Sequence, residues 1–177
     1  MTLTQSADRF MPIAATMLPE FDQEMKTTRA LIERVPDAKA SWKPHPRSMS
    51  LGELAAHIAN LVGWGTAIMS QPEFDFFPPG GKPQTPPPYR DATELVQRLD
   101  ANVASTRAAI AAASDEYLAQ HWKLKNGGRV IIDVPRVAAL RSFMINHHIH
   151  HRGQLSVYLR LNDVPLPSIY GPTADMT

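Results

Sequence analysis

The sequence predicts an all-α protein built as a four-helix bundle. Four segments of about 20 residues carry apolar side chains at helical spacing, and little of the chain alternates apolar and polar residues as a half-buried strand does. The 177 residues, 44% of them hydrophobic, suit one globular domain with a core of its own, so we treat residues 1–177 as a single domain. A small β-hairpin is predicted just before the last helix.

The first two helices are predicted in the N-terminal half. The first takes Pro19 in its first turn, where proline costs no hydrogen bond, and ends at Pro36. Its apolar positions are Leu18, Phe21, Met25, Leu31, Ile32 and Val35. The second starts after Ser50, a preferred N-cap residue, with Glu53 three residues on as in a capping box. Its inner face consists of Leu54, His57, Ile58, Leu61, Trp64 and Ile68.

The other two helices follow the same logic. The third is predicted from about Asp91 to Ser114, with Asp91 as N-cap and Glu94 at the capping-box position. Its apolar stripe consists of Leu95, Leu99, Val103, Thr106 and Ile110. The fourth is predicted from about Pro135 to Asn162. Its inner face consists of Val137, Leu140, Met144, His147, His151, Leu155 and Tyr158.

The connections differ in composition. Residues 72–89 hold seven prolines and two glycines, which predicts a loop because proline removes backbone donors. Residues 121–125 and 129–132 alternate around Asn126-Gly127-Gly128, the strongest short hairpin signal, so we expect two strands there and no larger sheet. Residues 164–172 predict an extended tail whose apolar side chains lie against the body.

Composition argues against several functions. With 18 basic and 17 acidic residues and no block of like charge, the chain has no basic patch for nucleic acid or an anionic membrane. The absence of cysteine removes disulfides, thiolate ligands and thiol nucleophiles supplied by the protein. We expect no signal peptide and no membrane span, because no apolar run is long enough. These features together predict a cytoplasmic protein.

Four of the seven histidines lie in the run His147-His148-Ile149-His150-His151. Histidine is the commonest metal ligand among side chains. His147 and His151 are four residues apart, so on a helix they stand one turn apart on the inner face and can converge on one ion. His148 and His150 form i,i+3 pairs with His151 and His147 respectively. Spacing alone therefore leaves open which two of the four are ligands.

A third ligand has to come from another helix. His57 is the one remaining histidine on an apolar helical stripe, and bundles build metal sites from inward side chains of facing helices. Three protein ligands leave a coordination position for water or substrate, as in catalytic zinc sites. Nitrogen ligands alone do not choose among Zn²⁺, Ni²⁺, Fe²⁺ and Cu²⁺. The alternative is a hydrogen-bonded core histidine at position 57 and a proton-sharing pair, or a wetted helix face, at 147 and 151.

The same residues carry a family resemblance. The run from His147 to Gln154, followed by Tyr158-Leu159-Arg160 and Pro167-Ser168-Ile169-Tyr170-Gly171, resembles the C-terminal signature of the DinB family of damage-inducible metalloproteins, which is distinct from the polymerase of that name. That family also carries a histidine on its second helix, in a pattern like residues 51–58 here. The resemblance spans nearly the whole chain. It implies a four-helix bundle of up-down-down-up order and metal ligands at His57, His147 and His151.

The resemblance also implies two chemistries: transfer or isomerisation with a low-molecular-weight thiol, and hydrolysis. In both, a divalent ion lowers the pKa of a bound thiol or water and supplies a nucleophile near neutral pH. Our leading hypothesis is a metal-dependent, thiol-dependent transferase acting on a small molecule, with Zn or Ni as the foremost metals and Fe, Mn or Cu as further candidates. A metal-dependent hydrolase and a non-enzymatic, stress-related metal-binding protein are the alternatives. The sequence identifies no catalytic acid or base, since Glu53, one turn from His57, is equally a capping residue.

Neighbouring residues have both structural and functional interpretations. Gln154 is expected to orient a ligand or to bond another helix, and Arg152 to be a surface or interface cation. Trp64, Tyr158 and Tyr170 are core aromatics or, alternatively, the apolar wall of a substrate pocket, with Tyr170 reaching over the site from the tail. His150 is an exposed residue or a proton relay.

Self-association is a further expectation. The family resemblance, with the small side chains of residues 108–109 and 111–113 on the third helix, predicts a homodimer.

Overall fold

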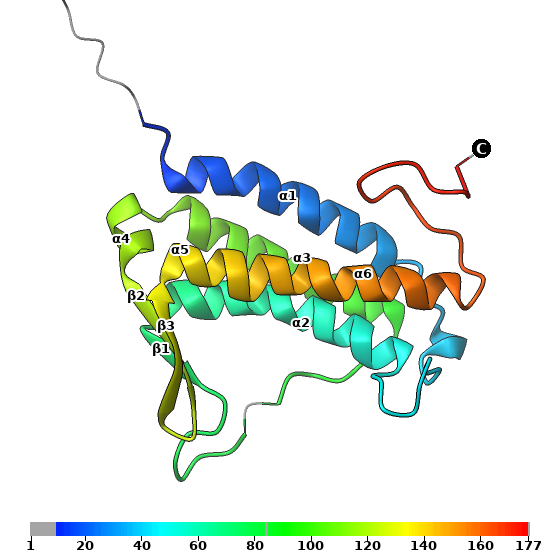
Figure 1. Cartoon of the computed structure of the whole chain (residues 1–177), viewed down its shortest axis with the longest axis horizontal. Helices are drawn as coiled ribbons and strands as arrows, with labels where there is room; N and C mark the ends of the chain where they lie inside the picture. Colours follow the sequence, from blue (N-terminus) through cyan, green and yellow to red (C-terminus); the bar gives the residue numbers. More distant parts are fainter. Residues whose placement is uncertain (1–9, 84, 177) are drawn as a thin grey trace, which may run out of the picture.

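The computed structural model describes residues 10–83 and 85–176, which are mostly helical with a small three-stranded sheet at one end (Figure 1). The helical segments are α1 (Ile13–Ile32), η1 (Asp37–Lys39), α2 (Leu51–Ser70), α3 (Ala92–Ala111), α4 (Asp115–Ala119), α5 (Arg136–Ala138), η2 (Ala139–Asn146) and α6 (His147–Arg160). The strands are β1 (Glu73–Asp75), β2 (His121–Asn126) and β3 (Arg129–Pro135). Among the described residues, no helix is both long and apolar enough to cross a membrane.

The long helices surround one apolar core. α2 packs against α3 on one side and against η2 and α6 on the other, while α1 packs against α3 and α6. Fully buried core side chains come from all of these elements and include Phe21, Leu31, Leu54, Ile58, Leu95, Leu99, Leu140 and Leu155. The apolar stripes expected from the sequence therefore face one another.

Helices α2 and α3 run in the same direction and approach closely. Asn102 Nδ2 donates to the carbonyl of Ala59 at 3.0 Å, and Thr106 Oγ1 donates to that of Val62 at 2.8 Å, so the partners advance together along both helices. The close approach depends on Gly65, where an added Cβ would lie 2.2 Å from Thr106 Cγ2. α1 runs the opposite way to α3, since Arg29 pairs with Asp100 and Asp22 pairs with Arg107.

Helix starts agree with the capping signals. Ser50 Oγ accepts the backbone N–H of Glu53 at 3.2 Å, and the Glu53 carboxylate accepts that of Ser50 at 2.6 Å, which completes the predicted capping box. Asp91 caps α3 by accepting from the Glu94 N–H at 2.8 Å, but the Glu94 side chain pairs with Arg98 instead of closing a box.

Two helix boundaries and the interior of one helix differ from the sequence prediction. α1 begins at Ile13, so Pro19 lies inside the helix and not in its first turn. α3 ends at Ala111, because Ser114 caps the separate short helix α4 by accepting from the Tyr117 N–H at 3.2 Å. The predicted fourth helix is one continuous rod whose middle portion, η2, is π-helical.

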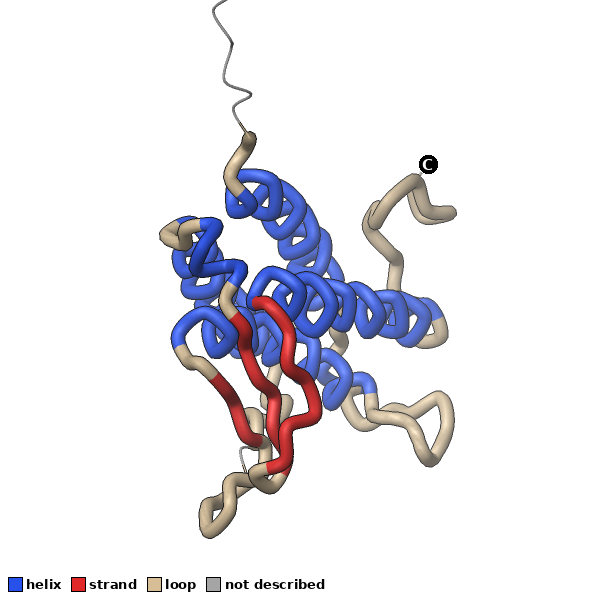
Figure 2. Tube along the Cα trace, turned by 60° about the vertical axis from the view of Figure 1, so that its left-hand side comes forward, coloured by secondary structure: helices blue, strands red, loops and turns tan. Residues whose placement is uncertain are grey.

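The sheet is larger than the predicted hairpin. β2 and β3 pair antiparallel around the Asn-Gly turn as expected, but β1 adds a third strand parallel to β2 (Figure 2). The five residues between Pro72 and Pro78 are free of proline and can donate hydrogen bonds, as Phe76 N–H does to the Lys125 carbonyl at 3.1 Å. The Asp75 carboxylate also accepts from the N–H groups of Gly127 and Gly128 at 3.0 and 2.7 Å, tying β1 to the hairpin turn.

Candidate metal site

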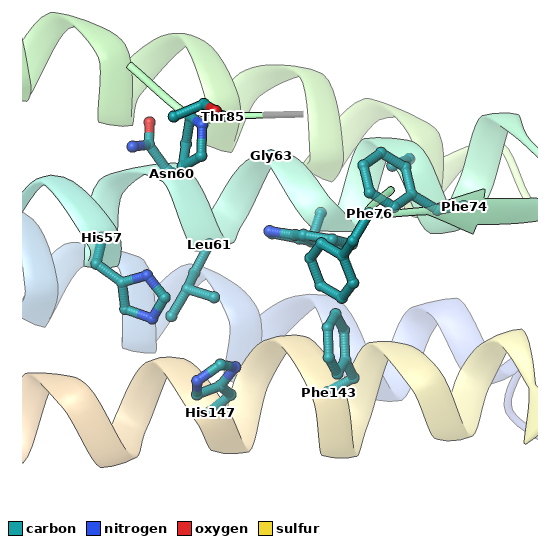
Figure 3. A pocket seen from close by; sticks show the side chains of 12 residues that line it. His57, Asn60, Leu61, Gly63, Phe74, Phe76, Thr85, Phe143 and His147 are labelled. Atoms are coloured by element: carbon teal, nitrogen blue, oxygen red, sulfur yellow. The ribbon is translucent and has the colours of Figure 1, made fainter. Parts of the chain in front are cut away.

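Helices α2 and α6 bring three histidine side chains together. His57, His147 and His151 each offer a ring nitrogen, and these atoms all lie within 4.8 Å of one another. The Nε2 atoms of His147 and His151 are 2.9 Å apart, and the His57 ring centroid lies 4.5 Å from that of His151. In Figure 3 the rings of His57 and His147 extend toward each other across the space between the two helices. This cluster contains the three residues that the sequence singled out.

Helix α6 places two of these rings on one face, and a neighbouring side chain orients one of them. His147 and His151 stand one turn apart at the start of α6, directly after the π-helical η2, and such π-helical turns often occur at functional sites. His151 Nδ1 lies 2.7 Å from Gln154 Oε1, so an N–H donated there leaves the Nε2 lone pair facing His147. Gln154 therefore orients a cluster member, the first of the two roles considered for it.

Burial keeps all three imidazoles neutral near pH 7. It lowers the pKa of His57 to about 4, with smaller contributions from His151 and His147. Burial also lowers the pKa of His147 and of His151, although the Phe143 carbonyl and Gln154, respectively, oppose this. Neutral imidazole is the form that coordinates a metal. Three such nitrogen donors could hold a divalent ion, and they do not by themselves select one metal.

The remaining members of the histidine run do not join the cluster. His148 is fully buried on another face of α6, where Nε2 lies 2.6 Å from Thr28 Oγ1. Burial, aided by the charge of Arg152, lowers its pKa to about 3. His150 is exposed, with its ring centroid 4.9 Å from that of His151. His121 pairs with Asp133 on the surface at 2.7 Å.

An apolar pocket of about 410 Å³ adjoins the histidines. Its lining residues are His57, Asn60, Leu61, Gly63, Trp64, Ala67, Phe74, Phe76, Thr85, Pro86, Phe143 and His147. Trp64 lines this pocket, which is the alternative to the core-packing role considered for it. Phe74, Phe76 and Phe143 were not predicted from the sequence. For Phe74 and Phe76 the available signal was an aromatic run inside a proline-rich loop, whereas Phe143 lies on η2.

Tyr158 and Tyr170 lie away from this pocket. Tyr158 packs edge-on against Trp42, with ring centroids 5.5 Å apart. The Tyr170 hydroxyl bonds the Glu24 carboxylate at 2.9 Å and Arg152 Nη2 at 2.6 Å, so the tail does not reach over the histidines at this residue.

Arg152 was expected to be a surface or interface cation, but it is 1% exposed within the fold. It forms a buried ion pair with Glu24, at 2.5 Å, that joins α6 to α1. Glu53 is engaged by its capping box and by Lys43 at 3.4 Å, so its carboxylate is held at the start of α2.

Comparison with known proteins agrees with this fold. The family model described as the DinB superfamily matches residues 20–155. The uncharacterized protein YrdA of Bacillus subtilis (strain 168) is 23% identical over 158 residues, which cover 89% of this chain and 88% of that protein. A DinB-like protein of Bacillus cereus ATCC 10987 superimposes with a TM-score of 0.67 at 21% identity, covering 90% of this chain and 98% of the other. The DinB-like protein YjoA of Bacillus subtilis gives a TM-score of 0.66 at 23% identity, covering 87% and 97%.

Proposed function

Since the chain belongs to the DinB superfamily, we propose that it binds one divalent metal ion through His57, His147 and His151 and acts as a metal-dependent enzyme of the thiol-transferase type. The observation that carries the proposal is the convergence of three neutral imidazoles beside an apolar pocket. Zn and Ni are the foremost candidates. Fe and Cu also suit imidazole ligands, and Mn, which prefers oxygen ligands, is the least favoured of the five.

Each residue of the site would have a distinct role. The three histidines would hold the ion, and Gln154 would keep the His151 ring turned so that Nε2 faces it. A bound divalent ion would lower the pKa of a thiol at its open position and keep it as a thiolate near neutral pH. The thiol must be a separate small molecule, because the chain has no cysteine. The pocket wall would exclude water from the organic cosubstrate.

The adjoining pocket favours an enzyme over a structural metal site. A structural metal site has a closed coordination sphere and needs no substrate cavity. A hydrolase would use the same ion on water, so it remains the outcome to expect if thiols prove inert. The pocket is largely apolar, which suits an organic acceptor.

Thiol-dependent turnover tests this proposal. We expect metal-loaded protein to join a biological thiol (glutathione, cysteine or coenzyme A) to chlorodinitrobenzene, with a C–S bond formed, the thiol proton passed to buffer and chloride released. Metal-free protein and His147→Ala should lose the rate enhancement. His150→Ala, an exposed histidine on the same helix, is the matched control and should keep it. A metal-loaded protein with no thiol-dependent rate but with metal-dependent ester hydrolysis would replace the transferase by a hydrolase.

Metal affinity should fall with pH, but at more acidic pH than is usual for histidine sites. Protons compete with metal for imidazole, and ordinary histidines with a pKa of about 6.5 would release it below about pH 6. Burial lowers the pKa of all three ligands here, that of His57 to about 4, so we expect full affinity to persist below pH 6 and to fall toward pH 4. A titration against a metal indicator from pH 8 to pH 4 measures this. A flat profile would mean that histidines do not dominate binding.

Circular dichroism must accompany that titration. The folded-state pKa of His148 is about 3, below its unfolded value of about 6.5. The unfolded chain therefore binds more protons between these values, and stability present above pH 6.5 falls as the pH drops through this window. Metal loss counts as coordination chemistry only where the helical signal is unchanged.

We propose the up-down-down-up helix order, supported by the parallel α2–α3 and antiparallel α1–α3 contacts.

We also propose that the protein forms a homodimer, supported by exposed small residues at Ala108, Ala111 and Ala112 of the α3 C-terminus. Sedimentation velocity at micromolar concentration tests it, and a monomer throughout would exclude it.

A further inference from the structure

The pocket beside the histidines has two chemically different ends. Its volume of about 410 Å³ lies within the usual range for small-molecule sites. His57 and His147 lie at one end, and the rings of Phe74, Phe76 and Phe143 gather at the other, with Leu61 on the path between them (Figure 3). A molecule placed in this pocket would therefore present one end to the histidines and the other to aromatic rings.

The aromatic end is a set of rings around Trp64. Its ring centroid lies 4.6 Å from that of Phe74, 5.1 Å from that of Phe76 and 5.1 Å from that of Phe143. The rings are inclined to one another by 62°, 56° and 79°, so they meet largely edge to face. Such an arrangement presents faces and edges together, which suits a flat apolar group.

This wall is built by secondary structure. Phe74 and Phe76 flank Asp75 in and after β1, and the pairing of β1 with β2 places both rings opposite α2. The Asp75 carboxylate fixes the segment by accepting from Gly127 and Gly128. Phe77, the next aromatic of the run, is 53% exposed and lies outside the pocket. Strand β1 thus fixes the positions of the Phe74 and Phe76 rings within an otherwise irregular loop.

The pocket offers no charge to a ligand. No Asp, Glu, Lys or Arg is among the described residues that line it, and apart from the histidines and Trp64 its polar side chains are Asn60 and Thr85. Both ends of the Asn60 amide are already used: Nδ2 donates to the Pro87 carbonyl at 2.9 Å, and Oδ1 accepts from Arg98 Nη1 at 3.2 Å. A charged group placed at the aromatic end would lose hydration without gaining an oppositely charged side chain as a partner.

We propose that this aromatic end selects an uncharged, flat apolar group, such as an aromatic ring, as the part of the substrate that lies away from the metal. This inference rests on the proposed function, since it names the acceptor class for the same site. Trp64, Phe74, Phe76 and Phe143 are the residues that set this specificity.

Ligand binding, measured apart from activity, tests the inference. Naphthalenemethanol, which is neutral, and naphthoate, its anionic analogue, are titrated by calorimetry into the full chain with and without Zn²⁺. We expect the metal-free protein to bind the alcohol at least about tenfold more tightly than naphthoate, a difference of about 1.4 kcal/mol. Ala67→Phe, which adds a ring inside the pocket, should weaken binding of the alcohol by at least about tenfold.

Two further variants control for the added ring and for misfolding of Ala67→Phe. Ala104→Phe adds the same ring at an exposed position of α3 and should leave the affinity within about twofold. Phe76→Leu removes aromatic area without adding bulk and should weaken binding even if Ala67→Phe fails to fold. Equal affinity for the two ligands, or no effect of Phe76→Leu, would overturn the inference. Zinc content is measured on the same samples, so loss of metal binding with ligand binding intact would reject the proposed function alone.

Discussion

Replacing both His57 and His151 by alanine is expected to abolish stoichiometric metal binding. Wild-type protein should hold about one divalent ion per chain after reconstitution, through three imidazoles whose nitrogens lie within 4.8 Å. The double variant keeps one ligand, so its affinity should fall by at least about a hundredfold, since loss of a mere supporting partner already costs 10–100-fold. Elemental analysis of tag-free protein after dialysis, and competition with a chelator, measure this loss.

Two single variants with smaller expected effects test whether the loss of metal binding is specific to the ligands. His150→Ala removes an exposed histidine from the same helical turn and should leave stoichiometry and affinity unchanged. Gln154→Ala frees the His151 ring and should weaken binding by about 10–100-fold while the stoichiometry stays the same. Unchanged metal content in the double variant would show that the ion binds elsewhere and would remove the basis of the proposed function.

The second large effect concerns stability and not the metal. Arg152→Met should destabilise the protein by about 3–5 kcal/mol, because it leaves Glu24, 6% exposed, as a buried carboxylate without its cation. The Tyr170 hydroxyl still donates to Glu24 but cannot neutralise it. Urea unfolding followed by circular dichroism, with the slope held constant, gives the change in unfolding free energy.

Three further variants separate burial from charge. Arg160→Met breaks a partly exposed pair with Asp175 and should cost less than about 1 kcal/mol. Glu24→Leu combined with Arg152→Met should recover much of the loss, because an apolar pair often replaces a buried ion pair at little cost. Tyr170→Phe should cost about 1.5–3 kcal/mol, the value of a hydrogen bond to a charged group, because the hydroxyl bonds both Arg152 and Glu24. An equal loss in Arg152→Met and Arg160→Met would contradict the role given to burial.

Features that depend on neighbours in the chain were predictable from the sequence. The Ser50–Glu53 capping box and the Asp91 cap are local contacts, and both are present. The pairing of His147 with His151 follows from one helical turn, and the hairpin follows from the Asn126-Gly127-Gly128 turn. The place of His57 beside that pair was an expectation from its apolar stripe and from the family resemblance. Helix packing brings the three together.

Tertiary structure alone decided the features that depend on distant segments. Helical periodicity identifies a buried stripe but does not say which element covers each residue on it. Arg152 is buried because Glu24 and Tyr170, far away in the sequence, neutralise and bond it, and no local pattern encodes that partnership. The apolar pocket beside the histidines exists because β1 pairs with β2 and places loop aromatics against Trp64. The pairing of β1 with β2 joins segments about 50 residues apart through backbone hydrogen bonds, which the local sequence pattern of neither strand specifies.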